Sequence, residues 1–380
     1  MKKLIALVAA MVMVAGTVYA GEWDFYGSAR VFTKFEDTEI SGGTDTDIFT
    51  QGLQGNARIG ARVKVNDELT GRFEYGASGG NANIRILWGE WDFGGGKFGV
   101  GQHYTPLNFF YSNQIVNSDN DLLPYGGVYS GRQAMLRLRF GGFQIAAVEP
   151  ASDTITVGVA DGTSGRDNDG DGDYDSADVA FSGTPLSTNI FFTNEANDDF
   201  DTAETNFPTI EAKYTFSMDN FTAQVAGGYN SFELSNGTTT VDIDSYVVAA
   251  GASVNFGMAY LKGDLYFGEN ADLLIFTDYS SGTEPARSVT GTTVNDIENF
   301  GFILVAGAKL NDMFAFEAGY GYAEADIDAG TDDEVQSYYV QATVTLAPGV
   351  FFVPELGVID YEEDAQNEIT YGAIKWQINF

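Results

Sequence analysis

The sequence predicts an all-β fold, a transmembrane antiparallel β-barrel of about 16 strands. Alternating polar and apolar runs of roughly 9 to 14 residues recur along the chain, the length that a tilted strand needs to cross a bilayer. The connections between the runs alternate between short and long, and the chain ends in an alternating strand, 371–380, closed by an aromatic residue. After residue 20 there is no apolar run long enough to cross a bilayer as a helix. Strands that cross a bilayer must close into a barrel, because lipid offers no partner to an open backbone edge.

The first twenty residues have the three parts of a secretory signal peptide. Lys2 and Lys3 form the positive start, 4–14 is the apolar stretch, and 18–20 supplies the small residues that a signal peptidase reads. We expect residues 1–20 to be cleaved on export. Residues 21–380 are then expected to form one barrel domain in the lipid of the bacterial outer membrane.

The composition agrees with a barrel of this kind. Aromatic residues make up 14% of the chain, and the mean hydropathy is −0.11, as expected when half of each strand faces lipid and half faces water. The net charge of −35 repels nucleic acid and argues against a nucleic-acid-binding role. The absence of cysteine leaves no disulfide framework and no lipid-modified cysteine.

Sixteen alternating segments are the predicted strands. They are 23–35, 56–65, 69–77, 83–93, 97–104, 132–140, 143–149, 208–216, 221–232, 242–256, 258–268, 297–310, 313–325, 335–347, 350–361 and 368–380. The short connections between them are rich in Gly, Asn and Asp, which suit tight turns: 66–68, 94–96, 141–142, 218–220, 311–312 and 348–349. The long connections are 36–54, 105–131, 150–207 and 269–298. Transmembrane barrels place short turns on the periplasmic side and long loops outside.

Each predicted strand has one polar and one apolar face. In the segment 56–65, Arg58, Arg62 and Lys64 point one way, while Ile59 and Val63 point the other. The apolar set must face lipid, because a charge at mid-bilayer costs about 2–4 kcal/mol. The polar set therefore lines a lumen, which sixteen strands make wide enough for an aqueous channel.

Seven arginines fall on the inward face of the first six strands and gather in one sector of the wall. They are Arg30, Arg58, Arg62, Arg72, Arg85, Arg137 and Arg139. Guanidinium groups stay charged even when crowded, so the row predicts a positive pore lining. The alternative is that these arginines pair with Asp and Glu on neighbouring strands.

The long connection 105–131 differs from the other long connections because it is apolar and poor in acids. Apolar groups such as Leu107 and Phe109 avoid water, so we expect this segment to fold into the barrel as a constriction loop. Asp119 and Asp121 would then face the arginines and create a transverse field at the narrow point. The alternative is an external loop folded onto its neighbours.

Together these features resemble the general porins of Gram-negative bacteria. The resemblance rests on the opening strand 24–30, the constriction-type loop after the fifth strand, the arginine cluster and the terminal Phe380. It implies a homotrimer of sixteen-stranded barrels that allows passive diffusion of ions and small hydrophilic solutes, with no enzymatic activity. Tyr125-Gly126-Gly127 stands where such porins carry a run like Pro-Glu-Phe-Gly-Gly, so the carboxylate expected there is missing.

The connection 150–207 is a long acidic external loop that contains a calcium-type motif. Its acids follow the spacing of an EF-hand or dockerin loop, with Gly172 at the sharp turn. The predicted ligands are Asp167, Asp169, Asp171, Asp173, Asp175 and Asp178. We expect a structural Ca²⁺ and no required cofactor. The alternative is a disordered acidic loop that binds cations loosely.

Three competing functions stay open from the sequence alone. A barrel-embedded enzyme would use His103, the only histidine, with Ser112, Ser118 or Asp119. A solute-specific channel would use Tyr104, Tyr111 and Tyr125 as an aromatic track for sugars. A surface adhesin would use the acidic outer loops.

The ion preference of the expected pore is also open. The arginine row favours anions, whereas the acidic mouth concentrates cations. We expect a cation preference at low salt, because screening weakens the contribution of the mouth first.

Overall fold

The computed structural model describes residues 21–40, 45–78, 81–150, 192–194, 202–235, 240–279, 287–290, 293–327, 332–362 and 366–380. The predicted signal peptide, 1–20, and the predicted calcium loop, 167–178, lie outside these residues.

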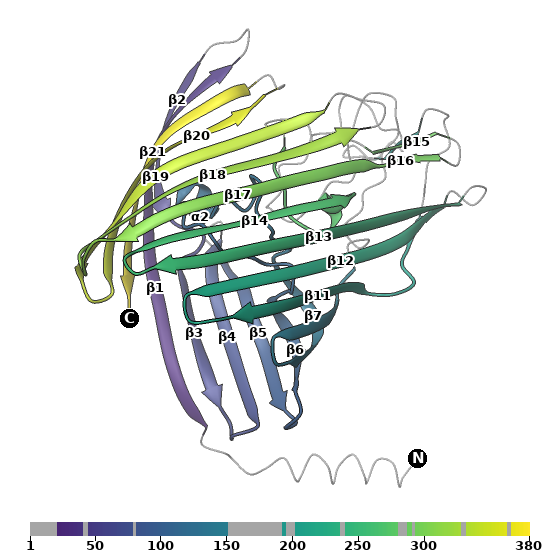
Figure 1. Cartoon of the computed structure of the whole chain (residues 1–380), viewed down its shortest axis with the longest axis horizontal. Coiled ribbons are helices and arrows are strands. Elements are labelled where there is room, and N and C mark those ends of the chain that lie inside the picture. Colours follow the sequence, from purple (N-terminus) through teal and green to yellow (C-terminus); the bar gives the residue numbers. More distant parts are fainter. Residues whose placement is uncertain are drawn as a thin grey trace.

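The wall of the barrel consists of sixteen strands (Figure 1). In order around the wall they are β1 (Glu22–Ile40), β3 (Arg58–Lys64), β4 (Leu69–Ser78), β5 (Asn81–Asp92), β6 (Lys97–Tyr104), β7 (Arg132–Phe140), β8 (Phe143–Val148), β11 (Thr209–Ser217), β12 (Phe221–Ser235), β13 (Thr240–Phe256), β14 (Ala259–Glu269), β17 (Ile297–Lys309), β18 (Phe314–Ile327), β19 (Asp333–Ala347), β20 (Val350–Tyr361) and β21 (Gln366–Asn379). Each strand pairs antiparallel with the next, and β21 pairs with β1 to close the ring. All sixteen predicted strands are confirmed, and 97–104, 132–140 and 350–361 agree to the residue.

Five further strands lie beyond the predicted set. β2 (Thr46–Leu53) pairs with the second half of β1, where β3 no longer reaches, and β10 (Thr202–Glu204) pairs with β12. β9 (Phe192–Asn194), β15 (Arg287–Thr290) and β16 (Thr293–Asn295) form a small separate sheet. The alternation criterion missed β2 because all eight of its residues are exposed, so neither face had to be apolar.

One end of the wall, here named the turn end, carries the short connections 65–68, 93–96, 141–142, 218–220, 257–258, 310–313 and 348–349. The opposite end is the loop end. Asn66 and Asn311 each use the side-chain oxygen to accept two backbone N–H groups of their own turn. Gly94 and Gly349 adopt positive φ, which glycine reaches without strain.

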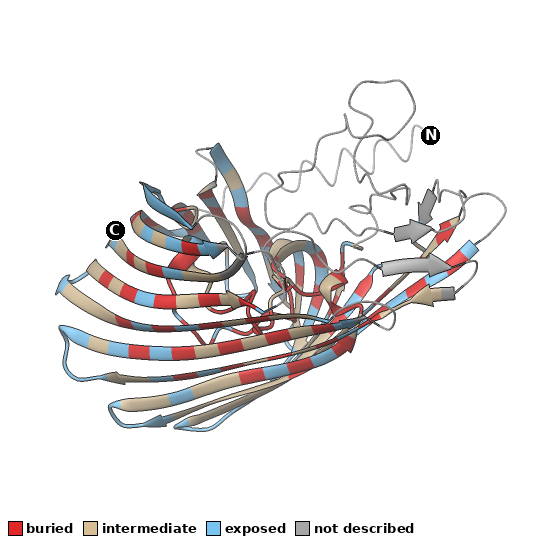
Figure 2. Ribbon diagram, turned by 90° about the horizontal axis from the view of Figure 1, so that it is seen from above, coloured by how far each residue is buried: buried red, intermediate tan, exposed pale blue. Residues whose placement is uncertain are grey.

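Burial alternates along the strands, as Figure 2 shows. In β13 every second residue from Val241 to Ala249 is buried, whereas Tyr246 and Val248 on the other face are 42% and 45% exposed. Large apolar side chains such as Phe25 and Leu136 are likewise exposed on the outer face, where a transmembrane barrel meets lipid. No helix in the described part of the chain is long and apolar enough to span a membrane.

The connection 105–131 lies inside the barrel, as predicted, and the alternative of an external loop is wrong. It contains the short helix α2 (Val116–Asp119), which Figure 1 draws within the ring of strands. Most of its apolar side chains, such as Leu107 and Phe109, are buried and pack in one core with wall residues such as Ile303 and Val305. Burial of these groups offsets the conformational entropy of ordering so long a connection.

Candidate functional site

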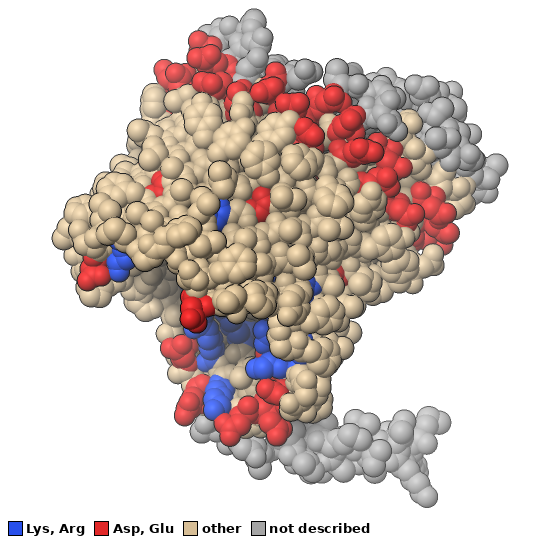
Figure 3. Space-filling model, viewed as in Figure 1, with Lys and Arg blue, Asp and Glu red and all other residues tan. Residues whose placement is uncertain are grey.

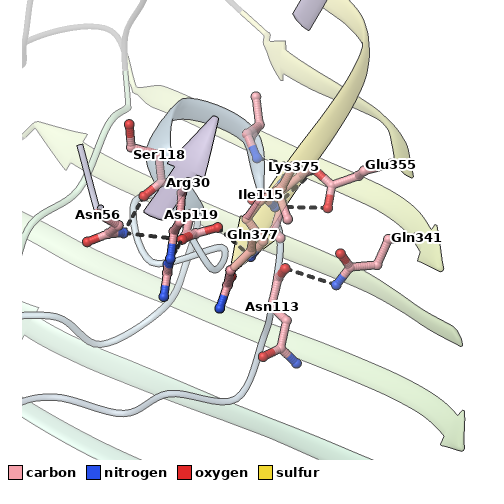
Figure 4. A network of polar contacts seen from close by, with 12 residues as sticks. Arg30, Asn56, Asn113, Ile115, Ser118, Asp119, Gln341, Glu355, Lys375 and Gln377 are labelled. Carbon is pink, nitrogen blue, oxygen red and sulfur yellow. Dashed lines mark hydrogen bonds and ion pairs between the residues drawn. The ribbon is translucent and has the colours of Figure 1, made fainter. Parts of the chain in front are cut away.

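Three glutamates of the wall hold the constriction loop, 105–131, against one side of the lumen. Glu355 of β20 accepts the backbone N–H groups of Ile115 at 2.9 Å and of Val116 at 3.2 Å, the first of which is drawn in Figure 4. Glu317 of β18 accepts the N–H of Asn113 at 2.8 Å. Such bonds satisfy loop N–H groups that would otherwise be buried without a partner.

The third of these anchors is Glu211 of β11. It accepts the N–H of Leu107 at 2.9 Å and the hydroxyl of Ser130 at 2.8 Å, so it fixes the beginning and the end of the loop. Sequence reasoning missed all three anchors. In the sequence, each anchor is an isolated Glu at an inward-facing position of a strand that is otherwise rich in apolar and small residues. This is the only feature that could have identified them.

The tip of the loop brings Asp119 between two cations. Asn117, Ser118 and Asp119 have φ of 49°, 74° and 63°, which turns the chain sharply. One oxygen of Asp119 lies 2.5 Å from Nη1 of Arg30, and the other lies 2.8 Å from Nζ of Lys375 (Figure 4). Burial opposes ionisation of Asp119, but Lys375 and Arg30 outweigh it and hold the pKa of this carboxyl below its usual value.

Asp121 has a different environment from the one predicted. Its carboxylate forms no ion pair with an arginine of the described chain. Desolvation, together with the neighbouring charge of Asp119, raises the pKa of Asp121 well above its usual value. Of the two predicted aspartates, only Asp119 contacts an arginine.

Glu74 of β4 gathers three of the seven arginines. Its carboxylate lies 2.8 Å from Arg72, 2.8 Å from Arg85 and 3.5 Å from Arg58, and it also accepts the hydroxyl of Tyr26. Arg85 reaches Glu74 because the pairing of β4 with β5 shifts by one residue there, a β-bulge. Arg85 and the next residue, Ile86, are therefore both buried, and the inward face of β5 continues with Trp88 and Glu90. A strict alternation of inward and outward residues, counted from Arg85, would have placed these three residues on the outer face.

The other four arginines also lie within 4 Å of a carboxylate. Arg30 contacts Asp119 as described, and Arg62 lies 3.7 Å from Asp24. Arg137 and Arg139 lie 3.7 Å and 2.7 Å from Glu90. The predicted sector and the alternative of pairing with neighbours therefore both describe the site. Seven guanidinium groups share four carboxylates, which leaves an excess of positive charge.

A cavity of about 660 Å³ lies at the turn end of the sector formed by these seven arginines, here named the arginine sector. Its lining comes from β1, β3, β4, β5, β6 and β7 and includes Arg62, Arg137 and Arg139. Figure 3 shows Lys and Arg side chains gathered in a hollow in the lower part of the molecule. Arg62 and Arg139 keep 60% and 39% of their side-chain surface exposed, so this part of the wall is open to solvent.

A second segment, here named the covering segment (270–279), folds over the constriction loop and includes the short 3-10 helix η2 (Ala271–Leu273). Phe276 donates its N–H to the carbonyl of Tyr129 at 2.7 Å, and Asp278 donates to that of Pro124 at 3.1 Å. Leu274 is buried with the loop residues. The connection 269–298 was expected to lie outside the barrel. This expectation is wrong for its first ten residues after β14, the covering segment, which pack against the constriction loop.

The aromatic track considered for sugars loses two of its three members. Tyr111 and Tyr125 are 6% and 0% exposed and pack in the core, so no solute reaches their rings. Tyr104 remains half-buried and accepts a hydrogen bond from Arg132, with the guanidinium 5.2 Å from the ring centroid.

His103 lies in an aromatic environment. Its ring is 5.5 Å from that of Trp88 and 6.0 Å from that of Tyr104. Its suggested partners are engaged elsewhere, since Ser112 hydrogen-bonds to Tyr339 at 2.7 Å and Asp119 binds Arg30 and Lys375. A serine hydrolase needs a hydrogen-bonded series of nucleophile, histidine and acid, which these side chains do not form.

A closed sixteen-stranded antiparallel barrel with a loop packed inside it is the architecture of outer-membrane channels. The solved structures that share it with this chain include the outer membrane channel DcaP of Acinetobacter baumannii, with a TM-score of 0.69, 13% identity and coverage of 96% of this chain and 99% of that one. The anion-selective porin from Comamonas acidovorans aligns with a TM-score of 0.57 and 13% identity over 95% of this chain and 100% of that one. OmpF of Salmonella typhi aligns with a TM-score of 0.57 and 14% identity over 95% and 98%. These likenesses confirm the predicted fold, whereas no family model and no curated protein matches the chain.

Proposed function

We propose that this chain is an outer-membrane porin that lets ions and small hydrophilic solutes diffuse passively through a water-filled pore, without catalysis and without a required cofactor. The arrangement of the lumen carries this proposal. The constriction loop is fastened to β11, β18 and β20, while the side chains of Arg62 and Arg139 on the arginine sector stay solvent-exposed. Solutes would pass between these two surfaces.

The ion preference of the proposed pore should depend on salt. Exposed carboxylates such as Asp242, Asp244 and Glu298 lie near the loop end, where Figure 3 shows a band of Asp and Glu. These exposed charges are screened over about 10 Å at 0.1 M salt, whereas the arginines inside the lumen are screened less. We expect a cation preference at low salt that weakens or reverses as salt rises.

Single-channel recording in a planar bilayer across a salt gradient tests the proposal. Stable open currents would support a water-filled pore, and the reversal potential at several salt concentrations gives the ion preference. Folded protein that never conducts would overturn the proposal and make a plugged barrel, a surface adhesin or an enzyme the next hypothesis.

The functional unit is proposed to be a homotrimer, exported with loss of residues 1–20. One solved relative, OmpT of Vibrio cholerae, is described in a trimer form. Conductance in steps of three and a trimer mass by analytical ultracentrifugation in detergent would support the assembly. The intact mass of protein purified from outer membranes tests cleavage before Gly21.

Calcium binding by the aspartates of 167–178 is a separate proposal that rests on their spacing. Elsewhere, in the described part of the chain, no group of three or more His, Cys, Asp or Glu could hold a metal ion. Calorimetry with calcium should give heat for the wild type and much less for Asp171→Ala. Equal heats would remove the site.

A further inference from the structure

The cavity at the turn end is set apart from the narrow point of the lumen. Most of its lining residues lie close to the short turns, for example Arg62 and Lys64 at the end of β3 and Arg139 at the end of β7. The contact of Asp119 with Arg30 and Lys375 lies elsewhere, and none of these three residues lines the cavity. The cavity is therefore a second charged region of the same lumen.

The cavity carries more positive than negative charge. Its lining contains five cationic side chains, Arg62, Lys64, Arg72, Arg137 and Arg139, and three carboxylates, Glu22, Asp24 and Glu90. Arg62 and Lys64 keep 60% and 53% of their side-chain surface exposed. Because Arg62 is 3.7 Å from Asp24, its nearest carboxylate, it has capacity for another acceptor.

Two arginines of the lining have donors that the protein leaves unused. Nε of Arg137 and Nε of Arg139 are buried and have no hydrogen-bond partner among the described residues. Arg137 is only 8% exposed. A buried donor without a partner is costly, so these groups indicate that an acceptor is missing from the site.

The position of Arg137 is fixed before any ligand arrives. Its guanidinium lies 4.6 Å from the ring centroid of Trp88, a cation–π contact. Trp88 in turn lies against Gly99, where a Cβ atom would stand 1.9 Å from the Trp88 ring. Glycine at position 99 therefore permits the tryptophan that supports Arg137, and the site loses little entropy when it binds.

We propose that this cavity is a binding station for oxyanions, that is, for the carboxylate, sulfate or phosphate group of a small solute. Guanidinium groups bind such groups through parallel charge-assisted hydrogen bonds, which a halide ion does not match. The inference rests on the proposed porin function, since the station would act on solutes that pass through the lumen. It adds that oxyanions pause at the turn end of the lumen, separately from the constriction.

Sodium sulfate is the probe, because its charge does not change near neutral pH. Calorimetry of the purified protein in detergent at constant ionic strength measures binding without any need for conduction. In parallel, sulfate is added to one side of a bilayer at a time while chloride current is recorded. We expect heat of binding, and stronger block of the current from the side of the turn end.

The test variant is Arg62→Gln with Arg139→Gln, which removes two exposed cations from the lining. We expect its sulfate affinity to fall about tenfold or more, the effect of losing charge-assisted hydrogen bonds. The control is Arg132→Gln, which removes one cation from β7 outside the lining, as many as Arg62→Gln alone removes from inside it, and should change affinity less than about twofold. Arg62→Gln alone, at a largely exposed position, covers the case in which the double variant does not fold.

Each outcome decides something. The proposed station is wrong if the wild type gives no heat of sulfate binding. It is also wrong if the test and control variants lose sulfate affinity to the same extent. Open current without sulfate heat or block leaves the porin function standing and removes the station. Sulfate heat that the variant loses, in protein that never conducts, supports the station and overturns the porin function.

Discussion

The two halves of the barrel wall use inward-facing charge in opposite ways. On the arginine sector, Arg62, Arg72 and Arg58 keep 60%, 25% and 22% of their side-chain surface exposed to the lumen. On the opposite half, Glu211 and Glu355 are 1% and 2% exposed and accept N–H groups of the constriction loop. In both halves, the alternation of side chains places charged groups on the inward face. An inward charge that faces the open lumen contacts water, whereas one that the constriction loop covers contacts protein.

Removal of an anchor on the loop-bearing half should have the largest effect. Glu355→Ala leaves the N–H groups of Ile115 and Val116 and the hydroxyl of Tyr371 without their acceptor. We expect a loss of stability on the order of 3 kcal/mol and passage of larger solutes, because the loop is released from β20. Thermal unfolding and liposome swelling with solutes of graded size measure the two effects.

The control for that variant is Glu298→Ala, which removes an exposed carboxylate from the outer face of β17. It should leave the size limit unchanged. If Glu355→Ala also leaves the size limit unchanged, then the wall carboxylates are not what holds the loop.

The second prediction concerns Glu74, the buried carboxylate of the arginine sector. Glu74→Gln leaves Arg58, Arg72 and Arg85 without their shared counter-charge. We expect the reversal potential to shift toward anions and the stability to fall by about 2–3 kcal/mol, because three crowded guanidinium groups then repel one another. A shift toward cations would contradict the view that this sector sets the field of the pore.

Removal of arginines should move ion preference in the opposite direction and by less. Arg62→Ala with Arg137→Ala removes two cations that Asp24 and Glu90 partly neutralise. We expect a modest shift of the reversal potential toward cations, largest at high salt, where the acidic loop end is screened. No change would exclude these arginines from the conducting path.

The smallest expected effect is that of mild acid on the loop tip. The pKa of Asp119 lies below its usual value of 3.8, so its pairing with Arg30 and Lys375 contributes stability above the unfolded pKa. That contribution is lost only as pH falls through the lower folded value. The effect of Asp119 on open-channel conductance should therefore be the same at pH 7 and at about pH 5, so that Asp119→Asn differs from the wild type by the same amount at both pH values.

Much of the fold follows from alternation, and the misses have physical causes. The wall strands were predictable because lipid favours apolar residues on the outward face of each strand where it crosses the bilayer. The anchors Glu317 and Glu355 were not predictable, because parity assigns a face but says nothing of the loop opposite. The path of the backbone between Asp119 and Asp121 was not predictable either, because Ser118, Asp119 and Asp121 adopt positive φ, which the residue types do not announce.

Asp119 has a consequence for the order in which the barrel is assembled. Arg30 belongs to the first strand of the chain and Lys375 to the last, and these two strands pair at the seam of the ring. Asp119 can hold both cations only after the ends of the chain have met. The lumen thus reaches its final shape only once β1 and β21 have paired. A chain that ends before β21 would lack the ion pair between Asp119 and Lys375.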